Sequence, residues 1–182
     1  MCTFITATVN EDADPERIEA TFERTRFCFV ELPAPAGIPA GRRYLAHNSG
    51  HCDCGTAVGE GYRDERPPYT PDDLAKLRKK GWSDAKIERW KAQKLDAEAK
   101  DERATLDRQR AAHRDLASYV DLVRAMLDTP GVRVFGLMHD FYSHGPGYDD
   151  LPVTAEAPRS FADLTEARLF HLPGGVVAEW TR

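Results

Sequence analysis

The sequence has little of what secreted and membrane proteins need. Its 182 residues contain no apolar run that approaches the length of a membrane span. The start, Met1-Cys2-Thr3-Phe4, has neither the basic residues nor the apolar stretch of a signal peptide. We therefore expect a cytoplasmic protein with no membrane partner. In that compartment cysteines stay reduced, which favours thiol chemistry or metal ligation over a disulfide framework.

An excess of basic residues is also missing. The chain has 25 Lys and Arg against 30 Asp and Glu, a formal net charge of -5. Nucleic-acid binding needs a basic face that displaces phosphate counterions, so this charge argues against nucleic acid as a general partner. The basic run Lys76–Lys80 is expected to lie on a solvated helix, without aromatic partners for phosphate nearby. No phosphate loop, dinucleotide fingerprint or zincin motif occurs.

Alternating or apolar segments on both sides of a helical middle predict a sheet. Asp14-Pro15 begins a short helix that ends near Thr25. The predicted strands are 3–9, 27–32, 43–47, 132–138, 168–172 and 176–180. Phe27–Leu32 is apolar on both faces, which indicates a central strand, and the last two strands are expected to form a hairpin. The pattern is typical of an α+β fold with a mainly antiparallel sheet.

The middle of the chain is rich in helix formers. A helix is expected to start at Thr70-Pro71 and end at Gly81, and residues 82–129 contain neither glycine nor proline. We expect at least one helix of about 20 residues or more there, unbroken or folded near 96–101 into a hairpin. A buried helical stripe is predicted at Leu106, His113, Leu116, Val120, Val123 and Leu127. The chain then forms one domain, 1–182, whose helical insertion, 70–129, contacts a protein partner or a second copy.

Thiols, imidazoles and a carboxylate gather between residues 47 and 56, which read His-Asn-Ser-Gly-His-Cys-Asp-Cys-Gly-Thr. In an extended backbone Cys52 and Cys54 point to one face, whereas Asp53 points to the other, beside His47. Paired thiols suit a soft cation such as zinc, and the flanking glycines let the backbone wrap around it.

A tetrahedral zinc site needs four ligands, and the two paired thiols supply only half of them. We expect the metal ligands to be Cys52, Cys54, His51 and Cys2, with a histidine of the 139–144 segment as another source. The leading interpretation is therefore a protein with a Cys/His site for Zn²⁺ and a helical arm for protein contacts.

The same thiols support a second interpretation, a thiol-dependent hydrolase or transferase. Cys2, Cys52 or Cys54 would be the nucleophile, and His139 or His144, which follow a predicted strand, would be the base. The Met-Cys start resembles that of class II amidotransferases, in which the amino-terminal cysteine uses its own α-amine as the base. Their next residue is glycine, whereas this chain has threonine, and it is short for their fold.

A third interpretation gives the cysteines only a packing role in an interaction, adaptor or immunity-type protein. Free cysteine behaves as a small hydrophobe, and Cys28, between two phenylalanines, is expected to be buried. His113 and His171 are likewise expected in the core. The Met-Cys-Thr start with the His-Cys-Asp-Cys-Gly-Thr motif at 51–56 resembles a group of short bacterial proteins of uncharacterised function. That resemblance implies that Cys2 belongs with the motif.

Overall fold

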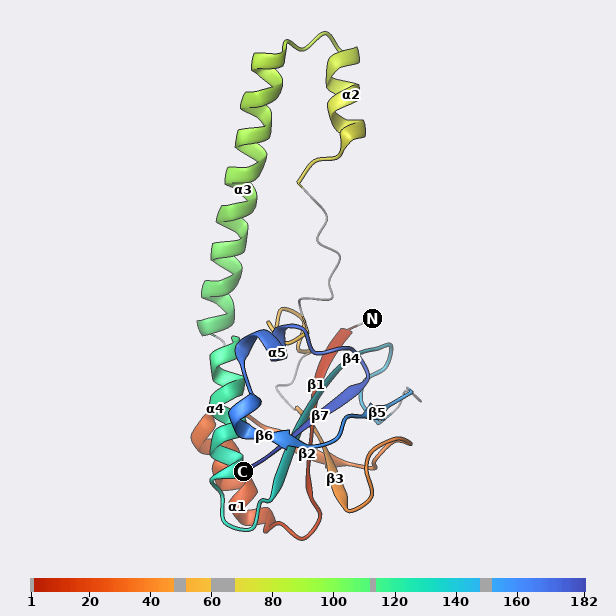
Figure 1. The fold of residues 1–182 in the computed structure, drawn as a ribbon, viewed down its shortest axis with the longest axis vertical. Coiled ribbons are helices and arrows are strands. Elements are labelled where there is room, and N and C mark those ends of the chain that lie inside the picture. Colours follow the sequence, from red (N-terminus) through yellow and green to blue (C-terminus); the bar gives the residue numbers. More distant parts are fainter. Residues whose placement is uncertain (1, 48–51, 60–67, 112–113, 148–151) are drawn as a thin grey trace. The chain divides into compact units, whose positions relative to one another are not determined.

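The computed structural model describes residues 2–47, 52–59, 68–111, 114–147 and 152–182. In chain order the elements are β1 (Cys2–Asn10), α1 (Pro15–Thr25), β2 (Phe29–Leu32), β3 (Arg42–His47), α2 (Pro71–Lys79), α3 (Asp84–Ala111), α4 (Leu116–Leu127), β4 (Val134–Tyr142), β5 (Thr154–Ala155), β6 (Arg159–Ser160), η2 (Phe161–Asp163), α5 (Glu166–Phe170) and β7 (Val176–Thr181) (Figure 1). The protein is α+β, as predicted, with the long helices inserted between β3 and β4.

The strands form one mixed, mostly antiparallel sheet in the order β2-β3-β1-β4-β7-β5, and β6 also pairs with β7. Of the described strands, β5 and β6 run parallel to their neighbour β7, and all other pairs are antiparallel. The prediction of a central strand at 27–32 is wrong, because β2 ends this path. Phe29 of β2 packs against a helix instead: its ring stacks on Phe22 of α1, with ring centroids 4.7 Å apart.

The segment 168–172 is helical, so the predicted strand and its hairpin are wrong. Thr165 caps α5 with a hydroxyl that accepts a hydrogen bond from the amide of Arg168. Leu169 and Leu172 are both buried, and their spacing of three fits a helical turn. His171 lies between them and is exposed, which corrects its expected place in the core.

One face of the sheet packs on α1, α4 and α5 (Figure 1). α4 contributes four side chains with no exposed surface, Tyr119, Leu122, Val123 and Met126. The predicted stripe is confirmed at Val123 and Leu127 but is wrong at Leu106, which is 43% exposed. The reason is that α3 ends at Ala111 and α4 begins at Leu116, so the stripe belongs to two helices. His113 lies outside the described residues.

The opposite face of the sheet holds a buried carboxylate. Glu179 of β7 is 2% exposed and accepts hydrogen bonds from Arg42 Nε at 2.8 Å and Nη2 at 3.1 Å, and from Thr8 Oγ1 at 2.9 Å. Gly136 of β4 leaves room for these groups, because a Cβ there would lie 2.4 Å from Thr8 Oγ1. The charge is paired and hydrogen-bonded, as a buried charge must be.

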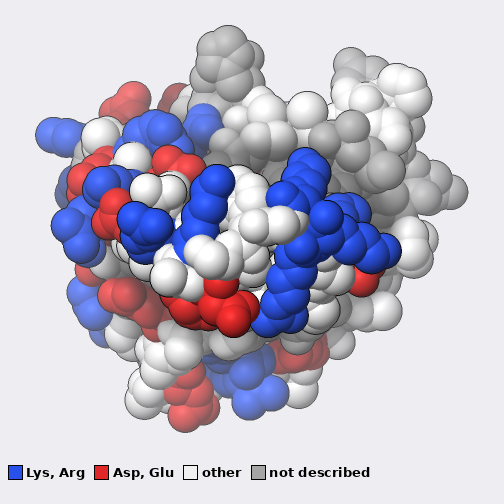
Figure 2. Space-filling model, turned by 90° about the horizontal axis from the view of Figure 1, so that it is seen from above, with Lys and Arg blue, Asp and Glu red and all other residues white. Residues whose placement is uncertain are grey.

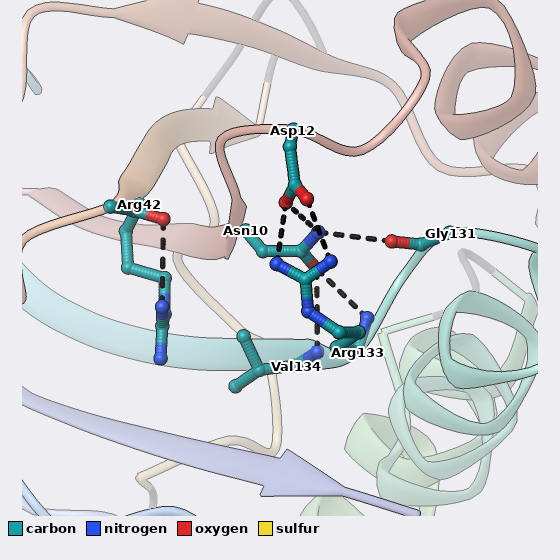
Figure 3. A network of polar contacts seen from close by, with 7 residues as sticks. Asn10, Asp12, Arg42, Gly131, Arg133 and Val134 are labelled. Atoms are coloured by element: carbon teal, nitrogen blue, oxygen red, sulfur yellow. Dashed lines mark hydrogen bonds and ion pairs between the residues drawn. The ribbon is translucent and has the colours of Figure 1, made fainter.

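The side chain of Asn10 ties the end of β1 to the start of β4 (Figure 3). Its amide nitrogen donates to the Gly131 carbonyl at 3.0 Å, and its oxygen accepts from the Arg133 amide at 2.9 Å. Arg133 also donates two hydrogen bonds of 2.7 Å to Asp12. These bonds, followed by one from Asn10, lower the pKa of Asp12 to about 2.

Asp12 is expected to contribute stability that is lost in acid. Its pKa in the folded protein, about 2, lies below the ordinary value of 3.8, so the contribution is present above about pH 4 and disappears as the pH falls towards 2. Urea unfolding of the wild type and of Asp12→Asn, compared from about pH 5 to about pH 2, measures it. The curves should converge in acid; parallel curves would contradict the assignment.

The chain divides into two compact units, residues 1–62 with 109–182, and residues 63–108. In the second unit Thr70 caps α2, and its side chain and that of Asp73 each accept from the other's backbone amide, as the predicted helix start requires.

The prediction of a long helix is confirmed by α3, which has 28 residues. α3 continues through 96–101, so the alternative prediction of a hairpin that breaks there is wrong. Asp96 pairs with Lys100 at 2.7 Å across that turn of the helix. No described helix is long and apolar enough to cross a membrane.

Candidate metal centre

A short segment, Cys52–Cys54, lies along the first half of β1. The second half of β1, from Thr6 to Asn10, pairs with β3. Beside the first half, the Asp53 amide donates to the Thr3 carbonyl at 2.7 Å, and the Thr3 amide donates to Cys54 Sγ at 3.3 Å. The segment therefore takes the place next to β1 that β3 leaves.

The carboxylate of Asp53 holds this segment in place. The side chain is fully buried, and Oδ2 accepts a hydrogen bond from the Ile5 amide at 2.8 Å. Oδ1 lies 2.5 Å from Nδ1 of His47, within hydrogen-bond distance. The His47 ring in turn contacts Phe29, with centroids 5.2 Å apart. Asp53 thus joins the segment to β1 and to the end of β3, on the face that the sequence predicts.

The three thiols of Cys2, Cys52 and Cys54 form one cluster, with their sulfur atoms all within 4.8 Å of one another. Cys2 and Cys52 are half-buried, and Cys54 is exposed. Sulfurs bound to one tetrahedral zinc lie about 3.8 Å apart, given Zn–S bonds of ~2.3 Å. A modest closure therefore brings the three thiols to ligand geometry. The prediction that Cys2 lies beside the motif is confirmed.

The fourth cysteine stands apart from this cluster. Cys28 is exposed, so its expected burial is wrong. Phe27 and Phe29 both turn inward, Phe27 onto Tyr119 and Phe29 onto Phe22, with ring centroids 5.0 and 4.7 Å apart. Because side chains alternate in an extended backbone, the residue between them faces solvent. His51, the fourth predicted ligand, lies outside the described residues.

Among the described residues, no histidine nitrogen belongs to the thiol cluster. His139, a candidate base, is buried in β4, and its Nε2 lies 2.6 Å from the Leu172 carbonyl oxygen, to which it donates. The ring also lies against Gly59, where a Cβ would be 2.1 Å from Nε2. This imidazole packs between two loops of the fold. His144, the other candidate base, is likewise not part of the cluster.

Comparisons of the chain with models of known protein families, with curated protein sequences and with solved structures found no match. What the site binds is therefore inferred from its own ligands. Thiolates are soft ligands that prefer zinc and Cu(I) over the hard cations calcium and magnesium, which take oxygen ligands. Metal-bound sulfurs also accept hydrogen bonds from backbone amides, as Cys54 accepts one from Thr3. The donor set fits a thiophilic metal ion.

Proposed function

We propose that this protein binds one thiophilic metal ion, zinc, through the thiolates of Cys2, Cys52 and Cys54. The observation that carries the proposal is that thiols from two segments far apart in the sequence lie within 4.8 Å of one another. Zinc takes cysteine thiolates as ligands, and three converging thiols supply three of the four that a tetrahedral site needs. His51, directly before Cys52, is the fourth ligand that we propose.

The role of the ion that we propose is structural. It would join the start of β1 to the segment that follows β3, two parts of the chain that meet only in the folded protein. A ligand that binds the folded state and not the unfolded one stabilises the fold by mass action. Nearby, Asp53 and the Ile5 amide hold the same two segments together by a hydrogen bond of 2.8 Å. The metal and the carboxylate would then act on one junction.

A thiol nucleophile is the competing function. It needs a base within hydrogen-bond reach of a sulfur, and the imidazole of His139 is instead directed to the Leu172 carbonyl. The geometry therefore supports metal binding better than nucleophilic catalysis. The two functions also differ in a measurable property, since a catalytic thiolate alkylates fast at neutral pH, whereas a metal-bound thiolate is protected until the metal is removed.

The test is the metal content of protein purified under reducing conditions without chelator. We expect one zinc per chain in the wild type, and none in the double variant Cys52→Ser, Cys54→Ser. Cys28→Ser is the matched control, because it removes an exposed thiol outside the cluster; it should retain the metal. Cobalt substitution should add intense sulfur-to-metal charge-transfer absorption to the wild type and to this control only.

Three outcomes would overturn the proposal. One is wild-type protein with four reduced thiols that takes up neither zinc nor cobalt on titration. Another is a thiol of the cluster that alkylates fast at neutral pH equally with and without chelator, which would favour the nucleophile. A disulfide between two cluster cysteines in protein isolated with reductant would likewise favour redox chemistry over metal binding.

A further inference from the structure

The second compact unit carries a concentration of positive charge that the composition of the whole chain hides. Of the 25 Lys and Arg, eight lie between residues 76 and 94, against two of the 30 Asp and Glu. The remaining residues carry 17 basic and 28 acidic side chains. We call residues 76–94 the basic tip; it spans the end of α2, the turn at Gly81 and the start of α3. The net charge of -5 therefore averages two regions of opposite sign.

Most of the cations of the basic tip are exposed and form no ion pair with a described carboxylate. Among the described residues, Arg78 lies 4.0 Å from Asp84, and Lys91 lies 2.8 Å from Glu88. The other six have no described carboxylate within ion-pair distance and are exposed: Lys76, Lys79, Lys80, Lys86, Arg89 and Lys94. Figure 2 looks down on the connection between α2 and α3, where Lys and Arg side chains gather around uncharged surface.

Aromatic rings lie among these cations, contrary to the sequence-based expectation. The ammonium of Lys86 is 3.9 Å from the centre of the Trp82 ring, and that of Lys94 is 5.8 Å from the centre of the Trp90 ring. Both tryptophans are half-buried. Tyr69, whose ring is 5.9 Å from that of Trp90, extends the aromatic surface. Ring faces beside cations are the surface that stacks on bases while it neutralises phosphates.

Acidic residues flank the basic tip within the same unit: Asp72 and Asp73 precede it on α2, and Asp96 follows it on α3. Asp73 accepts hydrogen bonds from Thr70 in the capping box, and Asp96 pairs with Lys100 at 2.7 Å, outside the tip. The tip therefore presents its six exposed cations to a partner, although the net charge of the whole chain is negative.

We propose that the basic tip binds the phosphate backbone of nucleic acid. Six exposed cations spread over two adjoining helices match a polymer of repeated phosphates better than a single small anion. A helix with its side chains is about 10–12 Å wide, the width of the major groove of DNA. A membrane surface fits less well, because the apolar side chains of the tip do not project: Ile87 is 1% exposed, and Trp82 lies beneath Lys86.

The test uses the full-length protein, a short mixed-sequence DNA duplex and one of its single strands, each with a fluorescent label, and follows anisotropy. The tip variant is Lys79→Gln, Lys80→Gln, Arg89→Gln. The control is Lys100→Gln, Arg103→Gln, Arg108→Gln, which removes the same charge from the mixed-charge part of α3. Glutamine has a helix propensity similar to that of Lys and Arg, so both variants should keep the helix, as circular dichroism would check.

We expect the wild type and the control to bind, and the tip variant to bind at least about tenfold more weakly. The slope of the logarithm of the binding constant against the logarithm of the salt concentration should fall in magnitude by ~1 for each lost phosphate contact. Absence of wild-type binding at low salt would overturn the proposal, and so would an equal loss in tip variant and control. A third result would also overturn the proposal: the wild type self-associates but does not bind DNA, and the tip variant no longer self-associates. The partner of the tip would then be the acidic surface of a second copy of the chain. All these residues lie outside the metal centre, so the outcome is independent of metal content.

Discussion

Replacing Asp53 with alanine is expected to lower the free energy of unfolding by about 3–5 kcal/mol, because it breaks a buried, hydrogen-bonded pair. The carboxylate is fully buried, and its loss leaves the Ile5 amide and Nδ1 of His47 without their partner. The same change should weaken metal binding by about 10–100-fold, as loss of a group that orients metal ligands does. Urea denaturation in the presence of chelator measures the first effect, and competition with a chromophoric chelator measures the second.

Two variants separate the role of Asp53 from a general loss of charge. Asp53→Asn keeps an acceptor for the Ile5 amide but loses the charge that faces His47, so its effects should fall between those of wild type and alanine. Asp163→Ala removes an exposed aspartate and should change neither quantity. An Asp53→Ala protein that loses less than about 1 kcal/mol and keeps the wild-type metal affinity would show that the segment is held by other contacts.

Replacing Leu122 with alanine is expected to cost about 3–5 kcal/mol of stability, since the side chain has no exposed surface and packs in the main core. Leu116, on the same helix, is only half-buried, and its replacement should cost about 1–2 kcal/mol. Urea denaturation followed by circular dichroism compares the two variants.

Leu95→Ala is the control for both leucine variants, because Leu95 on α3 is 49% exposed and alanine is at least as good a helix former. It should change stability by less than about 0.5 kcal/mol. Equal costs at Leu122 and Leu116 would contradict the position of α4 over the sheet and would indicate that the helix turns its other side to the core.

Much of the fold follows from local signals in the sequence. The alternation of residues within β1 predicts that strand, and Asp14-Pro15 predicts the start of α1. Thr70 and Asp73 likewise determine where α2 begins, because both halves of the capping box are within four residues. The 28 residues of α3 follow from the absence of glycine and proline over a longer stretch.

The errors lie where one pattern fits two structures. Phe27 and Phe29 read as a strand buried on both faces, but their partners are helix residues that only the folded chain brings near. For Phe27 and Phe29, local sequence does not contain the partners that select one structure over the other. Leu169 and Leu172 are compatible with a short apolar strand and with one helical turn, and here the helix cap at Thr165 is a local signal that the pattern of apolar residues overrode.

The candidate site shows the same division. The alternation of residues 52–54 predicts that Asp53 faces His47, which is a local property of an extended backbone, and the structure has that contact at 2.5 Å. The proximity of Cys2 to Cys54 depends instead on the amide of Thr3, which donates to the sulfur of Cys54, 51 positions away in the sequence. The contacts of Trp82 with Lys86 and of Trp90 with Lys94 were missed although each pair is four residues apart, a spacing that a helix brings together. The contact of Tyr69 with Lys91, in contrast, requires the segment before α2 to lie beside α3.

The segment 52–54 also protects the sheet from unwanted pairing. Thr3 and Ile5 lie in the first half of β1, with which β3 does not pair. There the amide and carbonyl of Thr3 and the amide of Ile5 point towards residues 53 and 54. Uncovered, these groups would form an open strand edge, which is a template for pairing with another chain. Residues 52–54 occupy that edge with a cysteine sulfur, a backbone amide and a carboxylate. These contacts leave the Thr3 amide and carbonyl and the Ile5 amide without a free group for another strand to pair with.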